Sequence, residues 1–275
     1  IHMYSRQFTQ YILGLVFLVS SSFAFGNTEF TYKYTIANGN ASISGCRYEC
    51  PQNLIIPSSI NGNEVVSIIG EAFSSEAIRS VLIPDSVLTI EERAFADNEL
   101  ISVLLGNGLL SIEDSAFENN SIRLINIPSS VSTIGSHAFS NNELVSIIIP
   151  SALTSIEAGT FSGNQLTSIT IPDGVTSIGY EAFYGNQLTN VTIPNSVTSI
   201  EPYAFQQNQL TSIQLPDSLI SIGDAAFSEN QLSSIQLPDS LISIGDGAFY
   251  GNQLTNVTIP DGITHINSYS FSSNK

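Results

Sequence analysis

The stretch NQLTNVTIP occurs twice, at residues 186–194 and 252–260, and Tyr184 and Tyr250 stand two residues before the two copies. The starting positions of the copies differ by three intervals of 22. Prolines that follow an apolar residue recur at this interval, at positions 84, 128, 150, 172, 194, 216, 238 and 260. Gly106 stands at the one position in this series that has no proline. Nine complete units therefore span residues 57–259, the first lengthened around Asn61-Gly62-Asn63, and a tenth, partial unit runs to Lys275.

A single unit is too small to fold by itself. In PDGVTSIGYEAFYGNQLTNVTI (172–193), seven apolar positions recur in almost every unit, and burying them contributes about 10 to 20 kcal/mol. Ordering the chain costs about 1.5 kcal/mol of conformational entropy per residue, and the total over one unit exceeds the free energy gained by burial. Stacked units share their apolar faces, so the period predicts a repeat solenoid in which each unit is stabilised by its neighbours.

The pattern within one unit predicts a mainly β solenoid. LTNVTI (188–193) is rich in β-branched residues and is followed by Pro194, which is typical of a short strand with a definite end. Because these strands lie one period apart, we expect them to pair in parallel as a sheet of about nine strands. The PDG or PDS that follows is a turn, and VTSI (175–178) is a second extended piece. GYEAF (179–183) favours a single helical turn, so we expect short helical turns or irregular structure on the outer side.

Two residue types recur once per unit, and we interpret both as structural. A phenylalanine recurs from Phe73 to Phe271, and its regularity predicts a core spine. An asparagine precedes each strand; its amide can bond open backbone groups, and stacked copies can bond each other. We therefore predict a structural ladder formed by Asn98, Asn120, Asn142, Asn164, Asn186, Asn208, Asn230 and Asn252, with Asn274 in the partial unit.

These motifs resemble the BspA-like leucine-rich repeats of bacterial and protist surface proteins. The resemblance rests on the IPDSV-like turns, the Ala-Phe pair and strands such as NQLTSITIP (164–172), and it covers residues 54–275. IPSSINGNEVVSIIGEAF (56–73) is similar to the first repeat of such arrays, and TYKYTIANGNASISGC (31–46) is similar to their β-hairpin cap, here placed at 27–53. The commoner leucine-rich pattern LxxLxLxxN differs, because here the asparagine precedes the strand.

Residues 1–26 have the pattern of a secretory signal peptide. A short positively charged start is followed by an apolar run from Tyr11 to Phe25. This run is too short for a transmembrane helix, which needs about 20 apolar residues. Cys46 and Cys50 agree with export. A metal site needs about four ligands and the histidines lie elsewhere, so we expect a local disulfide. The chain is therefore predicted to be secreted or displayed at the cell surface.

Charge excludes two classes of partner. The chain has 24 Asp or Glu against 7 Lys or Arg, a net charge of −17, and the segment between Arg123 and Lys275 contains eleven acids and no Lys or Arg. Nucleic acid and anionic membrane surfaces both require a basic surface, so we expect neither as a partner.

The sequence offers little that is typical of a catalytic site. His137 and His265 occupy ordinary repeat positions, and GxSxG, phosphate-loop and HExxH patterns do not occur. We therefore expect no enzyme and no cofactor. Stacked acidic pairs at Glu91-Glu92 and Glu113-Asp114 leave a structural calcium ion as a minor alternative, because calcium takes 6 to 8 oxygen ligands.

Function is then expected on the surface of the sheet. Strand alternation predicts that two residues per strand point outward, such as Asn190 and Thr192. The second of these positions gives the row Leu82, Leu104, Asn126, Ile148, Thr170, Thr192, Gln214, Gln236 and Thr258. The early part of this row is apolar, and Arg79 and Arg123 lie near it, which predicts an interaction patch. The alternative is that another segment of the chain covers these side chains.

The sequence leaves three functions open. The resemblance implies adhesion, with an extracellular protein or glycan bound to the sheet face. A rigid spacer that presents another domain is the second hypothesis, and the ending FSSNK, with no visible cap, favours this or a truncated chain. Rows of threonines leave ice or mineral binding as a third, although Gln214 and Gln236 interrupt them.

Overall fold

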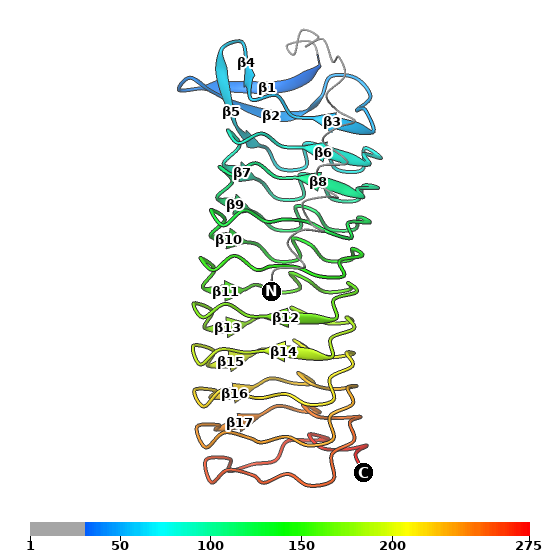
Figure 1. Cartoon of the computed structure of the whole chain (residues 1–275), viewed down its shortest axis with the longest axis vertical. Helices are drawn as coiled ribbons and strands as arrows, with labels where there is room; N and C mark the ends of the chain where they lie inside the picture. Colours follow the sequence, from blue (N-terminus) through cyan, green and yellow to red (C-terminus); the bar gives the residue numbers. More distant parts are fainter. Residues whose placement is uncertain (1–30) are drawn as a thin grey trace, which may run out of the picture.

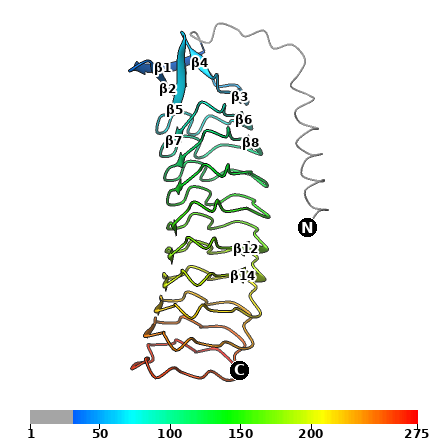
Figure 2. The ribbon, with the colours of Figure 1, turned by 60° about the vertical axis from the view of Figure 1, so that its left-hand side comes forward.

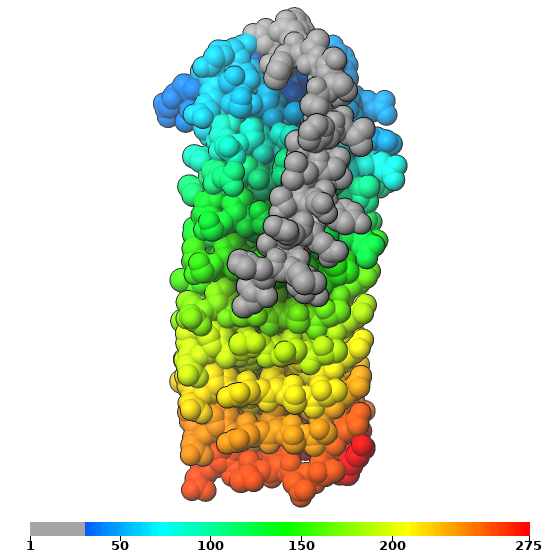
Figure 3. All heavy atoms as spheres, viewed as in Figure 1, coloured from blue at the N-terminus to red at the C-terminus, as the bar shows by residue number. Residues whose placement is uncertain are grey.

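The computed structural model describes residues 31–275, and the predicted signal peptide (1–26) and the first residues of the predicted cap lie outside this range. The described residues form a column of stacked rungs, with the N-terminal strands at one end and the C-terminus at the other (Figure 1). The rungs remain stacked after a turn of 60° (Figure 2), and the colours run in order along the space-filling column (Figure 3). The solenoid predicted from the period is confirmed.

All regular secondary structure between residues 31 and 275 is β-strand. The cap and first unit contain β1 (Tyr32–Ala37), β2 (Asn40–Cys46), β3 (Asn53–Ile55), β4 (Ser59–Ile60) and β5 (Asn63–Ile68). Three-residue strands at the LTNVTI position are β6 (Ser80–Leu82), β8 (Ser102–Leu104), β12 (Ser168–Thr170) and β14 (Asn190–Thr192). Two-residue strands at the VTSI position are β7 (Thr89–Ile90), β9 (Ser111–Ile112), β10 (Thr133–Ile134), β11 (Ser155–Ile156), β13 (Ser177–Ile178), β15 (Ser199–Ile200), β16 (Ser221–Ile222) and β17 (Ser243–Ile244).

Strand pairing is parallel between repeats, but the more continuous sheets form at the VTSI position. There, β5, β7, β9 and β10 pair in order, and β11, β13, β15, β16 and β17 form a second sheet. At the LTNVTI position only β3-β6-β8 and β12-β14 pair regularly, so the prediction of one sheet of about nine strands was wrong. The two-residue strands each lie between two hydrogen-bonded turns, such as Val175 N–H to Pro172 O and Ala182 N–H to Gly179 O. These turns recur in most units and hold successive short strands in the same register.

The GYEAF segment is a pair of turns in which two positions per unit have positive φ. Glu181 has a φ of 53° and Gly185 a φ of 63°. The first position is left-handed in all ten units: Glu71, Arg93, Ser115, His137, Gly159, Glu181, Tyr203, Ala225, Gly247 and Tyr269. A right-handed helix needs negative φ at successive residues, so the prediction of a helical turn was wrong. Instead, Phe183 N–H donates to Ala204 O of the next unit at 2.8 Å.

The left-handed turn yields a first testable prediction, on two neighbouring alanines. Ala225 has a φ of 50°, whereas Ala226 is fully buried and is not a positive-φ residue. A left-handed conformation costs a residue with a Cβ about 1–2 kcal/mol, and glycine loses about 0.5–1 kcal/mol of backbone entropy. We expect Ala225→Gly to raise the free energy of unfolding by about 0.5 kcal/mol and Ala226→Gly to lower it by at least about 1 kcal/mol. Urea denaturation measures both, and equal losses in the two variants would contradict the argument.

The phenylalanines form the predicted spine. The rings from Phe73 to Phe249 are fully buried, and successive rings are stacked with centroids between 5.2 and 5.9 Å apart. Phe271 stacks on Phe249 at 5.4 Å. At the N-terminal end, Tyr32 meets Phe73 edge-on with centroids 6.4 Å apart. The cap therefore covers the first ring of the spine with a side chain of its own.

The cap is a hairpin joined to the first repeat. β1 and β2 pair antiparallel through a turn at Asn38 and Gly39, both with positive φ, as two-residue hairpin turns favour. The Tyr32 hydroxyl donates to the Ile55 carbonyl at 2.6 Å, and burial raises the pKa of Tyr32 to about 12. The predicted disulfide joins Cys46 to Cys50.

Candidate interaction surface

From the second unit onward, one asparagine per unit, half-buried at Asn98 and buried from Asn120 to Asn252, joins each rung to the rung before it. The Nδ2 of Asn164 donates to the carbonyls of Phe139, Phe161 and Ser162 at 2.9, 3.2 and 3.2 Å, and its Oδ1 accepts from Leu144 N–H at 2.9 Å. Phe139 and Leu144 belong to the preceding unit. We call this set the amide ladder, and equivalent bonds recur for Asn98, Asn120, Asn142, Asn186, Asn208, Asn230 and Asn252.

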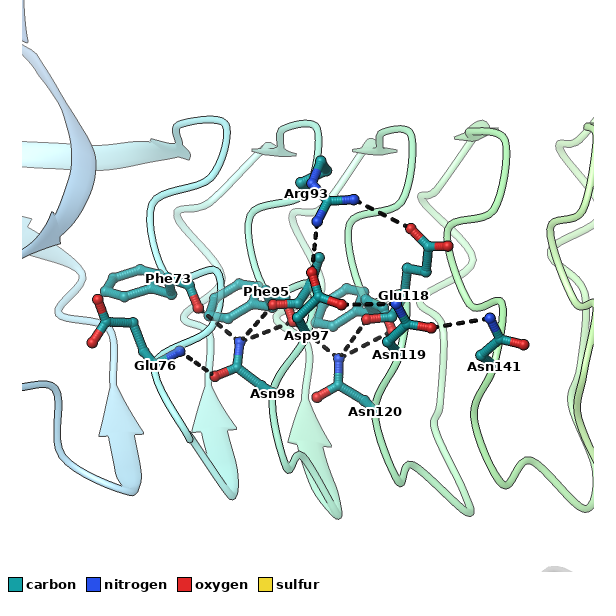
Figure 4. A network of polar contacts seen from close by, with 12 residues as sticks. Phe73, Glu76, Arg93, Phe95, Asp97, Asn98, Glu118, Asn119, Asn120 and Asn141 are labelled. Carbon is teal, nitrogen blue, oxygen red and sulfur yellow. Dashed lines mark hydrogen bonds and ion pairs between the residues drawn. The ribbon is translucent and has the colours of Figure 1, made fainter.

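The amides of the ladder do not bond one another within residues 31–275, so that part of the prediction was wrong. Both polar atoms of each amide are already used by backbone groups of two units, which leaves nothing for the next amide. A row of side-chain bonds between rungs exists at another position, one residue earlier. Asn119 donates to Asp97 at 2.7 Å and Asn141 donates to Asn119 at 3.0 Å (Figure 4).

Arg93 lies beside that second row and ties two rungs together. Its guanidinium forms ion pairs with Asp97 at 2.6 Å and Glu118 at 3.4 Å (Figure 4). The pairs are partly exposed, so each contributes no more than about 1 kcal/mol. At these rungs the turn side of the column is therefore occupied by contacts between rungs. The predicted outward row of the LTNVTI position makes no such contacts within the described residues, and most of its side chains are exposed.

The outward row of the LTNVTI position has the character expected from strand alternation. Eight of the nine predicted side chains are exposed: Leu104, Asn126, Ile148, Thr170, Thr192, Gln214, Gln236 and Thr258. Leu82 is half-buried. Ile148 is 80% exposed and Leu104 is 45% exposed, so no described segment covers them. The row is apolar toward the cap and polar toward the C-terminus.

The structure adds three apolar residues that sequence reasoning missed. Ile55 pairs in register with Leu82, and Leu82 with Leu104, so the apolar row begins in the cap. Ile101 and Leu124 are also exposed, in neighbouring rows of the same face. We call the whole set the sheet-face patch, formed by Ile55, Leu82, Ile101, Leu104, Leu124 and Ile148. The predicted row began with the first complete unit at Pro57, so it did not include Ile55. The available signal was that Ile55 lies two residues before Pro57, as Leu82 lies two residues before Pro84.

A shallow hollow borders the patch. Its volume is about 600 Å³, and Leu82, Leu104, Pro84 and Gly106 contribute to its lining. Gly106 replaces the recurring proline here, and a Cβ at this residue would lie 2.3 Å from the Pro84 carbonyl oxygen. The close backbone approach explains the skipped proline and shapes one wall of the hollow.

Two arginines flank the patch on a molecule that is otherwise acidic. Arg79 and Arg123 are both exposed, in the same row as Ile101 and on either side of it. Arg79 lies 3.9 Å from Glu99, a long and exposed pair, and Arg123 has no ion pair within the described residues. The face therefore combines apolar side chains with accessible guanidinium groups, a composition enriched at protein interfaces.

The described residues contain no cluster of three or more His, Cys, Asp or Glu side chains placed to hold a metal ion. Glu91 is instead bonded by Ser67 Oγ and Gly70 N–H, at 2.7 and 3.1 Å. Between residues 31 and 275, no helix has the length and apolar character needed to cross a bilayer.

The repeats match a known family over nearly the whole chain. Residues 20–145, 66–187 and 154–275 match the description "BspA type Leucine rich repeat region", with six copies. A comparison with curated protein sequences gave no match.

Solved structures share the fold. A leucine-rich repeat protein from Bacteroides ovatus ATCC 8483 is 19% identical with a TM-score of 0.54, and 92% of each chain is covered. The pneumococcal vaccine antigen PcpA is 20% identical with a TM-score of 0.58, over 89% of this chain and 86% of that one. A leucine-rich cell surface protein from Faecalibacterium prausnitzii A2-165 is 24% identical with a TM-score of 0.51, over 92% and 81%.

Proposed function

Because this chain belongs to the BspA-type leucine-rich repeat family, we propose that it is a non-catalytic binding protein, secreted or held at the cell surface, that docks an extracellular protein on its sheet face. The observation that carries the proposal is the sheet-face patch, above all Ile148 at 80% exposure and Leu104 at 45%. Contiguous exposed apolar residues rimmed by polar ones are typical of protein interaction sites.

Rigidity supports the same proposal. The amide ladder and the phenylalanine spine join every described rung to the next, so the face is held in one shape before a partner arrives. A preformed face loses little conformational entropy on binding. A protein partner fits better than a glycan at this place, because the patch offers mainly apolar contacts and few hydrogen-bonding groups.

Location at the cell surface has separate support. A leucine-rich cell surface protein and a vaccine antigen are among the solved structures with this fold. The pattern of residues 1–26 predicts export, and a disulfide such as Cys46–Cys50 persists in oxidising compartments. The net charge of −17 disfavours nucleic acid and anionic membrane as partners.

A triple substitution tests the patch. We expect the variant carrying Leu82→Lys, Leu104→Lys and Ile148→Lys to lose at least about tenfold in affinity for a partner found in a panel of extracellular proteins and whole cells. Three desolvated apolar contacts, each about 1 kcal/mol or more, would be replaced by solvated charges. Surface plasmon resonance measures the affinity, and circular dichroism checks that the variant is folded.

The matched control places the same charges on the polar half of the same row, as Thr170→Lys, Thr192→Lys and Thr258→Lys. This control adds an equal charge, so it separates loss of the patch from a change in net charge. Equal loss of affinity in both variants would contradict the assignment of binding to the patch.

A rigid spacer is the second candidate function. The uninterrupted spine from Phe73 to Phe271 favours it, because each rung is stacked on the next along the whole column. If the unmodified chain binds nothing in the panel, the spacer is the better account of this chain.

A further inference from the structure

The hairpin cap carries a second surface feature, distinct from the sheet-face patch. Side chains of Lys33, Tyr34, Ser44, Arg47 and Tyr48 line a hollow of about 490 Å³, and we call this set the cap site. The hollow is shallow and largely open to solvent, so a ligand would lie against its surface. No residue of the cap site belongs to the sheet-face patch, so the two sites can be tested independently.

A β-bulge builds the floor of the cap site. Lys33 pairs with Gly45 and Tyr34 pairs with Ile43, so Ser44 is the extra residue without a partner. Gly45 has a φ of 133°, and a Cβ there would lie 2.7 Å from the Ala72 carbonyl oxygen, so glycine is required. Bulges redirect side chains and are frequent beside functional sites.

The disulfide holds the other wall. Arg47 and Tyr48 lie between Cys46 and Cys50, inside the small ring that the bond closes. The Arg47 Nε donates to the Tyr32 carbonyl at 3.1 Å, which orients the guanidinium, and its two terminal nitrogens donate to no group within residues 31–275. Asn61 Nδ2 donates to the Tyr34 hydroxyl oxygen at 2.8 Å, so this oxygen is fixed while its proton stays available.

Charge and aromatic surface together define the ligand. Within residues 31–275 neither Lys33 nor Arg47 has an ion pair, although the chain has 24 acids and only 7 bases. Two such cations lining one hollow suit a carboxylate, which an arginine can bind through two parallel hydrogen bonds. The Tyr48 side chain is highly exposed and offers a ring face, while Ser44 and Tyr34 add hydroxyl groups.

We propose that the cap site binds a carboxylated sugar, with the carboxylate between Lys33 and Arg47 and the sugar ring against Tyr48. Hydroxyl groups of the sugar would exchange hydrogen bonds with Ser44 and Tyr34. The chain then has two binding surfaces, an apolar one for a protein on the sheet face and a polar one for an acidic glycan on the cap.

Titration of the full chain with four probes tests this site: N-acetylneuraminic acid, glucuronic acid, neutral N-acetylglucosamine and acetate. We expect NMR shift changes in cap residues with at least one acidic sugar, and binding at least tenfold weaker for N-acetylglucosamine and for acetate. Arg47→Gln and Lys33→Gln should each weaken binding of the acidic sugar at least tenfold, and Tyr48→Ala about fivefold. Lys33 and Tyr48 are exposed, so their variants test the site even if Arg47→Gln fails to fold.

Arg79→Gln on the sheet face is the matched control, because it removes one exposed arginine that does not line the cap hollow, and we expect its affinity to stay within twofold. Three results would overturn the proposal. They are absence of binding by both acidic sugars, acetate binding as tightly as the sugars, and equal weakening by Arg79→Gln and Arg47→Gln. None of these results bears on protein binding by the sheet-face patch.

Discussion

Replacing Asn164 with alanine is expected to lower the free energy of unfolding by about 3 to 5 kcal/mol. The substitution removes four hydrogen bonds, leaves the Leu144 N–H buried without a partner, and leaves the Phe139 carbonyl with only the longer bond from Asn142 at 3.2 Å. Each unsatisfied buried group costs about 1–3 kcal/mol, and no described side chain nearby replaces the amide. Urea denaturation followed by circular dichroism measures the loss.

Asn190→Ala is the control for this prediction, because Asn190 is exposed on β14 and forms no side-chain hydrogen bond within the described residues. We expect its unfolding free energy to stay within about 0.5 kcal/mol of the unmodified chain. A solenoid distributes its stability between neighbours, so loss of a central contact can also split unfolding into two steps. A small effect of Asn164→Ala, similar to that of Asn190→Ala, would show that the amide ladder is not a main source of stability.

Phe183→Ala is the second substitution with a large expected effect, about 3–5 kcal/mol of unfolding free energy. The ring is fully buried and stacks on Phe161 at 5.6 Å and on Phe205 at 5.4 Å. Truncation leaves a cavity between two rings that the neighbouring rungs hold in place, so collapse can relieve little of the cost. Thermal and urea unfolding both report the change.

Phe271→Ala provides the comparison within the same spine. Phe271 is half-buried and, within residues 31–275, stacks on Phe249 alone. Because Phe271 has one stacked neighbour and is only partly buried, we expect Phe271→Ala to lower the free energy of unfolding by about 1–2 kcal/mol, less than Phe183→Ala does. If the two variants lose the same stability, the cost does not come from the stacked neighbours and the account of the spine is wrong.

Much of the fold could be predicted from the sequence because its repeats impose one arrangement many times. A phenylalanine that recurs once in every unit has to stack on its copies, and the sequence places it in the core before any coordinates are known. The outward character of Leu104 and Ile148 follows from alternation along a strand, which is a local rule. The family resemblance also implied a solenoid of stacked repeats, and the structure confirms this fold.

Other features depended on contacts between rungs, which a pattern within one unit does not contain. The left-handed φ at Ala225 and Glu181 allows backbone hydrogen bonds to alternate between partners in the same unit and partners in the next unit. Neither an alanine nor a glutamate side chain indicates this backbone conformation. The amide of Asn164 bonds carbonyls rather than Asn142, because the backbone of the preceding rung lies within its reach. Contacts between rungs also decide that the longer sheets form at the VTSI position and not at the LTNVTI position.

The sequence by itself determined the period, the buried spine and the polarity of the sheet face, because each of these repeats at a spacing that can be counted. The tertiary structure decided where side chains from different units meet. Ile55 lies beside Leu82 through strand register, and Lys33 and Arg47 line one hollow next to a bulge and a disulfide loop. Both groupings exist only after the chain has folded, because residues distant in sequence become neighbours through hydrogen bonds and packing between rungs.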